Sequence, residues 1–132
     1  MALRHPRTAR LLRPADFAAL RERSQRVSTR QFTAQYRLTS AGGARLGMAV
    51  SRKVSKNAVE RNRIRRQIRE SFRLLRARLT HLDVLVIARV SAAQQANPVL
   101  RAELDTLWQR LIGAAAAATL NETQPPGTMR AS

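Results

Sequence analysis

The stretch AVERNRIRRQIRESFRLLR, from Ala58 to Arg76, combines two patterns in one segment. Its apolar residues recur every three or four positions, which is the spacing of one face of an α-helix. These residues are Ile64, Ile68, Phe72 and Leu75, and Leu79 continues the series. Asn57 is placed to cap the helix, and Glu60 follows three residues later, as in a capping box. The sequence therefore predicts an amphipathic helix of about four to five turns.

The other side of this helix carries its charge. At about 100° per residue, the polar positions fall in a band beside or opposite the apolar stripe. The band contains Asn62, Arg65, Arg66, Arg69, Arg73 and Arg76. From Arg52 to Arg78 the chain has eleven arginine or lysine residues and two glutamates, a local balance of +9. This basic face is either a solvated surface or the binding site of a polyanion.

The whole chain favours the second interpretation. It has 132 residues, enough for one domain with a real core, and a net charge of +17. Phosphates relieve such self-repulsion by displacing counterions, so nucleic acid is the leading partner class and an anionic membrane surface is the main rival. Solubility alone needs far less charge. The chain has no cysteine, which fits a reducing compartment, and we expect neither a membrane span nor a secretory signal.

Two runs before the basic helix have the alternation of β-strands. In Val27–Leu38, apolar residues alternate with Thr33, Gln35 and Arg37, and a second strand follows the glycine-containing turn at 39–44. We expect the two strands to form an antiparallel hairpin. One face of the second strand bears only small side chains, from Gly47, Ala49 and Ser51. Such a face accommodates either a closely packed helix or a ligand lying across it.

The remaining elements complete an α+β domain of order α-β-β-α-β-α. A short helix is predicted over 14–23, a buried central strand over Asp83–Val90, and a last helix over Val99–Ala118. The core stripe of the last helix is expected to be Leu100, Leu104, Leu107, Trp108 and Leu111. We expect a basic N-terminal arm at 1–13, a folded domain at 14–118 and a flexible tail at 119–132.

No set of residues has the pattern of a protein active site. His5 and His81 lie in no nucleophile or metal-binding motif, the acidic residues fall on different elements, and there is no glycine-rich phosphate loop. Any reaction is therefore supported by binding. A DNA-binding module is disfavoured because no helix-turn-helix is recognisable. A lipid binder is disfavoured because the apolar stripe is needed for the core.

The run SRKVSKNAVERNRIRRQIRESFRLLR, from Ser51 to Arg76, resembles the protein component of bacterial ribonuclease P. The hallmark is an Arg-Asn-Arg triplet that opens a long basic helix, here Arg61, Asn62 and Arg63. The flanking order also matches, from LLRPADF through RLGMAVSRKV and DVLVIARV to the closing Leu/Trp helix. The resemblance covers about residues 10–112. A structural ribosomal or other RNA-binding protein is the alternative, against which the triplet in its context argues.

The resemblance implies a fold and a function. The fold is a single-domain α/β sandwich of the ribosomal-protein type, with a mixed four-stranded sheet, helices and an uncommon left-handed βαβ crossover. In such an enzyme a catalytic RNA removes the 5′ leader of precursor tRNA, and the protein assists as an accessory endoribonuclease subunit in the bacterial cytoplasm. The implied partners are ribonuclease P RNA and the leader, with no membrane and no small-molecule substrate. The implied cofactor is Mg²⁺, bound mainly by the RNA, with no metal or catalytic residue in the protein.

The resemblance also implies two sets of site residues. The RNA-binding set is Arg52, Lys53, Lys56, Arg61, Asn62, Arg63, Arg65, Arg66, Arg69 and Arg73. The leader-cleft set is Phe17, Arg21, Thr33, Gln35, Arg37, Ala49 and Ser51. Gln35 stands where relatives carry an aromatic or apolar residue, and Arg21 stands where some relatives carry a second aromatic. Leader stacking is therefore expected to be weaker here and polar contacts more important. The small-sided strand face then becomes a groove for extended RNA.

Overall fold

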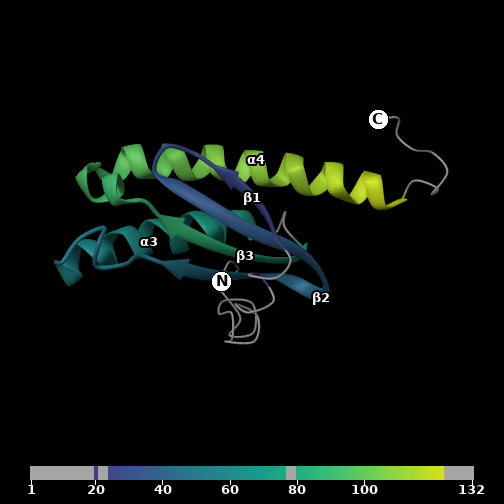
Figure 1. The fold of residues 1–132 in the computed structure, drawn as a ribbon, viewed down its shortest axis with the longest axis horizontal. Coiled ribbons are helices and arrows are strands. Elements are labelled where there is room, and N and C mark those ends of the chain that lie inside the picture. The colour runs from purple at the N-terminus through teal and green to yellow at the C-terminus, as the bar shows by residue number, and fades with distance from the viewer. Residues whose placement is uncertain (1–19, 21–23, 77–79, 124–132) are drawn as a thin grey trace.

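The computed structural model describes Leu20, residues 24–76 and residues 80–123. Along the chain these residues form the following elements: β1 (Gln25–Ser28), β2 (Phe32–Ala49), α3 (Ala58–Leu75), β3 (Thr80–Ala88), the short 3-10 helix η2 (Val90–Gln94) and α4 (Asn97–Thr123). Figure 1 shows the strands in one layer with the two long helices beside it. The predicted arm at 1–13 and most of the predicted helix at 14–23 lie outside the described residues, although Leu20 is helical and fully buried.

The sheet is mixed because β2 passes on both sides of β3. In its first part, β2 runs antiparallel to β3, with Phe32 opposite Ala88 and Leu38 opposite Leu82. In its last part, β2 runs parallel to β3, with Ala44 opposite Leu82 and Ala49 opposite Ile87. Four strand segments therefore lie side by side, in the order β1, first part of β2, β3, last part of β2. This confirms the mixed four-stranded sheet and the central position of the predicted strand, although the bounds Asp83–Val90 are wrong: the strand is Thr80–Ala88, and Val90 begins η2.

The predicted hairpin between the two strand runs is wrong. Its two arms are separated by β3, and α3 connects the last part of β2 to β3 as the crossover of a βαβ unit. Alternation of apolar residues identifies strands but not their partners, which is why the sequence pattern missed the inserted strand. The handedness of this crossover stays a prediction.

The predicted strand at Val27–Leu38 is also wrong in its extent. The chain turns after Ser28, and β1 pairs with β2 through Ser28 opposite Thr33 and Gln25 opposite Tyr36. The Thr29 backbone N–H donates to the Phe32 carbonyl at 2.8 Å and closes this turn. The turn contains no glycine, proline or asparagine, so the usual sequence signal for a turn is missing.

Both long helices pack on the same face of the sheet. Ile64, Ile68 and Phe72 of α3 are fully buried in one cluster with the inward-facing residues of β2 and β3. The predicted core stripe of α4 belongs to the same cluster. The rings of Phe72 and Trp108 lie 5.7 Å apart, and the indole N–H of Trp108 donates to the hydroxyl of Ser71. The apolar stripe predicted for the basic helix is therefore confirmed for the part that the structure describes.

The local sequence predicted the start of α3 correctly but not the end of α4. Asn57 caps α3 as predicted, because its side-chain oxygen accepts a hydrogen bond from the Val59 N–H at 2.9 Å. Helix α4 continues five residues past its predicted end at Ala118, to Thr123. No glycine or proline occurs between Ala118 and Pro125, and the alanine run favours continuation. None of the described helices is long and apolar enough to cross a membrane.

Candidate RNA interface

The basic surface begins in the segment between β2 and α3. The hydroxyl of Ser51 accepts from the Lys53 N–H at 3.2 Å, and the hydroxyl of Ser55 accepts from the Asn57 N–H at 3.1 Å. These short-range bonds fix the backbone of a segment whose cationic side chains are exposed. Those side chains belong to Arg52, Lys53 and Lys56. The segment therefore holds three positive charges at the entrance of the helix.

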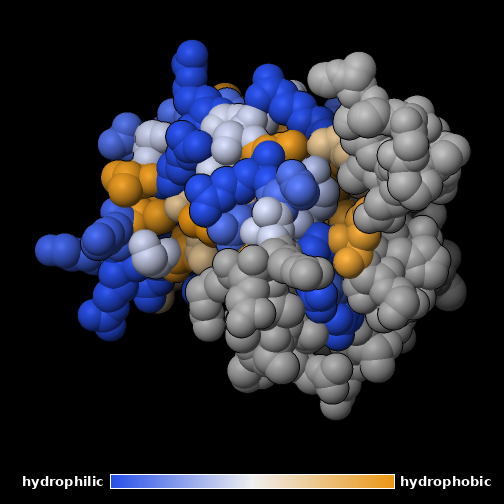
Figure 2. Space-filling model, turned by 45° about the vertical axis from the view of Figure 1, so that its right-hand side comes forward, coloured by the Kyte–Doolittle hydropathy of each residue, from blue (hydrophilic) through white to orange (hydrophobic). Residues whose placement is uncertain are grey.

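Helix α3 extends this surface along its outer side. Asn62, Arg66 and Arg69 are exposed, whereas the apolar stripe on the same helix is fully buried. Arg66 and Arg69 make no hydrogen bond or ion pair with any described residue. A guanidinium group in this state keeps all five of its donors available for phosphate oxygens. The space-filling view shows many hydrophilic side chains projecting from the described surface, with hydrophobic residues between them (Figure 2).

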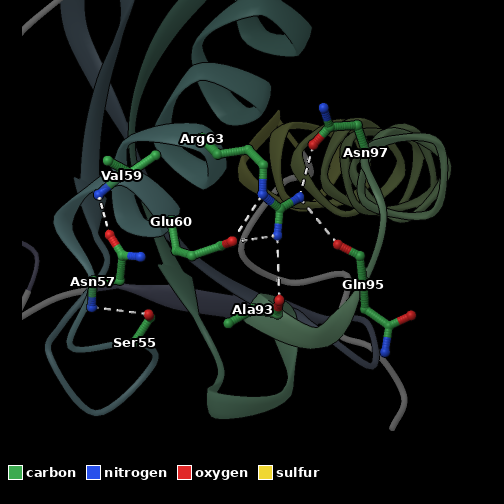
Figure 3. A network of polar contacts seen from close by, with 8 residues as sticks. All are labelled: Ser55, Asn57, Val59, Glu60, Arg63, Ala93, Gln95 and Asn97. Atoms are coloured by element: carbon green, nitrogen blue, oxygen red, sulfur yellow. Dashed lines mark hydrogen bonds and ion pairs between the residues drawn. The ribbon is translucent and has the colours of Figure 1, made fainter.

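The Arg-Asn-Arg triplet does not act as one unit. Arg61 donates to the carbonyl of Ser55 at 3.0 Å, and Asn62 is exposed. Arg63 points inward and uses all five of its N–H donors within the protein (Figure 3). The acceptors are the Glu60 carboxylate, twice, at 2.9 and 3.0 Å, the Ala93 and Gln95 carbonyls at 3.2 and 3.0 Å, and the Asn97 side-chain oxygen at 2.7 Å.

Arg63 therefore joins three elements. Its guanidinium group connects the first turn of α3 to η2 and to the start of α4. The resemblance implies that the whole triplet binds RNA, but this geometry gives Arg63 a structural function. Glu60, which was expected to bond back to the cap residue, contacts Arg63 instead. The sequence contains no signal that separates Arg63 from its basic neighbours, because the distinction depends on η2 and α4.

The other basic residues of α3 are partly engaged. Arg65 makes two long contacts, to the Asn62 oxygen at 3.4 Å and the Val50 carbonyl at 3.5 Å. Arg73 pairs with Glu70 at 2.9 Å on the exposed side of the helix. The hydrogen bond from Arg73 lowers the pKa of the Glu70 carboxyl group, and the charges of neighbouring arginines act in the same direction. The free cationic donors are thus concentrated on Arg66, Arg69 and the segment before the helix.

The predicted leader residues of the strands share one sheet face, opposite the helices. Thr33 and Ala49 lie on either side of Ile87, and Gln35 and Gly47 lie on either side of Leu85. Ser51 is exposed just beyond the end of β2. Phe17 and Arg21, the predicted helical side of the cleft, lie outside the described residues. The small side chains of the last part of β2 are thus in register with the polar residues of its first part.

This face also contains an ion-pair cluster that sequence reasoning missed. Asp83 is fully buried, and both of its oxygens accept from Arg45 at 2.8 Å. Arg37 contacts the same carboxylate at 3.4 Å and so has a structural contact, while its role toward the leader stays a prediction. The signal lay in the strand alternation, which puts Arg37 and Asp83 on the same face as the other predicted leader residues. In the described part of the chain, no three His, Asp or Glu side chains gather as a metal site would require.

Together these features define an α+β protein with a basic helix side and an adjoining polar strand face, the kind of surface expected of an RNA-binding protein. Comparisons with known proteins agree. A family model described as Ribonuclease P matches residues 5–112. Proteins called ribonuclease P protein component from Salmonella typhi and Salmonella newport are each 43% identical over 108 residues, which is 82% of this chain and 91% of theirs.

Solved structures support the same assignment. The RNase P protein of Staphylococcus aureus has a TM-score of 0.72 at 31% identity, covering 77% of this chain and 94% of that one. The RNase P protein of Thermotoga maritima has a TM-score of 0.67 at 26% identity, covering 76% and 96%. The chain therefore belongs to the ribonuclease P protein family, whose members are part of an endoribonuclease that processes tRNA.

Proposed function

We propose that this chain is the protein subunit of a bacterial ribonuclease P, where it binds the catalytic RNA and the 5′ leader of precursor tRNA. The observation that carries the proposal is the free basic surface of α3 in a chain of this family. Arg66 and Arg69 have no partner among the described residues and lie on a helix whose opposite side is anchored in the core. Their charge is therefore available to RNA without any cost to packing.

The basic surface is assigned to phosphate contacts with the catalytic RNA. Each neutralised phosphate releases counterions, so affinity is expected to fall steeply as salt rises. Exposed Lys53 and Lys56 extend the contact before the helix, and Asn62 adds a hydrogen-bonding group between the charges. The two glutamates of α3 do not oppose this binding strongly, because Glu60 and Glu70 are both paired with arginines.

The leader is assigned to the strand face. The small side chain of half-buried Ala49 lets an extended RNA strand approach the last part of β2, and half-buried Thr33 and Gln35 offer polar contacts from the first part of β2, across β3. Thr33 already accepts hydrogen bonds from Arg89 at 3.0 and 3.3 Å, which adds a cation beside the face. We expect leader binding to depend more on such polar groups than on stacking, since the family resemblance matches Gln35 to a position that is aromatic or apolar in relatives.

Mg²⁺ is the cofactor of the proposed reaction, and it would supply activation of the attacking water. The side chains of the basic surface do not fit a site for this ion. They are cationic or amide groups, and the two carboxylates of α3 are ion-paired. We therefore assign the ion to the RNA component, and we assign to the protein the fixing of RNA phosphates and leader. Since the relatives are bacterial, we propose the bacterial cytoplasm as the location, with no membrane or small-molecule substrate involved.

Cleavage of precursor tRNA at low Mg²⁺ tests the proposal. Three samples are compared: a bacterial ribonuclease P RNA alone, the purified protein alone, and both together. We expect cleavage to be strongly stimulated in the mixture and absent with the protein alone. A mixture that cleaves no faster than the RNA alone would reject the assignment.

A further inference from the structure

A small pocket lies on the outer surface where α3 meets the start of α4. It has a volume of about 290 Å³, and its walls are Val59, Asn62, Arg63, Arg66, Gln67 and Asn97. Figure 3 shows Val59 and Asn97 on opposite sides of Arg63, which closes the gap between the two helices. Because Arg63 makes five hydrogen bonds there, this wall is fixed before any ligand arrives.

The three amide side chains of the pocket, from Asn62, Gln67 and Asn97, share one hydrogen-bonding pattern. Each amide oxygen already accepts a hydrogen bond from an arginine. Asn97 accepts from Arg63 at 2.7 Å. Asn62 and Gln67 accept from Arg65 and Arg101, each at 3.4 Å. The amide NH₂ groups remain, and they can only donate. Together with the guanidinium group of Arg66, they give the pocket an excess of hydrogen-bond donors.

The pocket also has an apolar wall. Val59 is 74% exposed, the most exposed of the large hydrophobic residues described. A phosphate would use the donors but leave this wall and much of the volume empty. A nucleobase has both a flat apolar face and a polar edge, and unpaired bases in RNA are commonly bound in this way. The edge that suits donors alone is the N7 and O6 edge of guanine, which carries two acceptors, whereas the same edge of adenine carries a donor.

We propose that this pocket binds an unstacked guanine of the RNA partner through its N7 and O6 edge, with Val59 against the base and Arg66 at the adjoining phosphate. The proposal rests on the proposed function for the presence of RNA at α3. It adds base selectivity to a surface whose other contacts, being to phosphates, carry no sequence information. Asn62 thereby becomes a specificity-determining residue within the triplet, and Arg63 a positioning residue behind it.

Short oligoadenylates with one central substitution test the proposal by fluorescence anisotropy with the full chain. The central residue is adenosine, guanosine, inosine, which keeps N7 and O6, or 7-deazaguanosine, which lacks N7. All four carry the same charge. We expect the guanosine and inosine oligomers to bind about tenfold more tightly than the adenosine oligomer, with 7-deazaguanosine losing most of that preference.

Two variants test whether the preference for guanosine over adenosine depends on the amide groups of the pocket. Asn62→Asp and Gln67→Glu each replace a donating NH₂ group by an accepting oxygen, and Gln109→Glu is the matched control on the exposed side of α4. All three lower overall RNA affinity through charge, so the readout is the ratio of guanosine to adenosine affinity. We expect loss of the ratio in either pocket variant and its preservation in the control.

Equal binding of all four oligomers by the wild-type chain, or an unchanged ratio in both pocket variants, would overturn the proposal. These results are independent of the cleavage assay. If the protein stimulates cleavage by ribonuclease P RNA but does not select guanine, the proposed function is supported and the guanine pocket is rejected. If it selects guanine but does not stimulate cleavage, the guanine pocket is supported and the proposed function is rejected.

Discussion

Replacing Arg63 by alanine should destabilise the protein without removing a phosphate contact. The side chain gives hydrogen bonds to three acceptors outside its own helix: the Ala93 carbonyl, the Gln95 carbonyl and the Asn97 oxygen. At about 1 kcal/mol each, their loss amounts to about 3 kcal/mol. The pair with Glu60 adds only a few tenths of a kcal/mol, because both groups are partly exposed. For a domain of this size the unfolding midpoint should fall by about 10 °C.

Arg66→Ala is the matched control, because it removes the same charge from the same helix, three residues after Arg63. Arg66 has no partner among the described residues, so its loss should leave the midpoint nearly unchanged. Thermal unfolding followed by circular dichroism gives the first readout. The salt dependence of RNA affinity gives the second, and Arg66→Ala should reduce its log–log slope by about 0.7–0.9 while folded Arg63→Ala protein keeps the slope. A stable Arg63→Ala protein with a reduced slope would refute the division between these two residues.

Further predictions concern the core and the sheet. Phe72→Ala should lower the free energy of unfolding by about 3–5 kcal/mol in denaturant titrations, because the ring is fully buried; a loss below about 1 kcal/mol would mean that α3 is rotated. Asp83→Asn should cost about 3 kcal/mol in the same assay, since it leaves Arg37 and Arg45 without their carboxylate, and an unchanged stability would contradict this account. Burial raises the pKa of Tyr36 above 10.0, so stability should be full below pH 10 and fall as the pH rises through the raised pKa; phenolate absorbance of this single tyrosine reports its midpoint, and a midpoint at or below 10.0 would count against burial as its cause.

The sequence predicted the helices of this fold better than the arrangement of its strands. The stripes of α3 and α4 recur with a helical period over several turns, and capping at Asn57 is local, so neighbouring residues carry the information. The pairing of β2 with β3 on both sides depends on contacts between residues far apart in the chain. The resemblance to a family supplied the mixed sheet, which alternation alone did not.

In the candidate site, too, some features follow from the local sequence and others depend on residues far apart in the chain. Exposure of Arg66 and Arg69 follows from their places opposite and beside the apolar stripe, which the sequence shows directly. The inward direction of Arg63 does not, since its acceptors come from η2 and α4. Asp83 has no charged partner nearby in the sequence, and two arginines from β2, Arg37 and Arg45, explain its burial. A charge pattern thus predicts which segments are rich in cationic side chains. It does not predict which of these side chains form hydrogen bonds or ion pairs within the folded protein.

The most direct test of the central claim combines cleavage with the free basic surface of α3. Precursor tRNA cleavage is measured at low Mg²⁺ with a bacterial ribonuclease P RNA and either the wild-type protein or the Arg66→Ala, Arg69→Ala double variant. The account predicts that the wild-type protein stimulates cleavage, that the double variant unfolds at the wild-type temperature, and that it needs a higher protein concentration or lower salt for the same stimulation. Equal stimulation by both proteins at every salt concentration would contradict the claim that this surface binds the RNA.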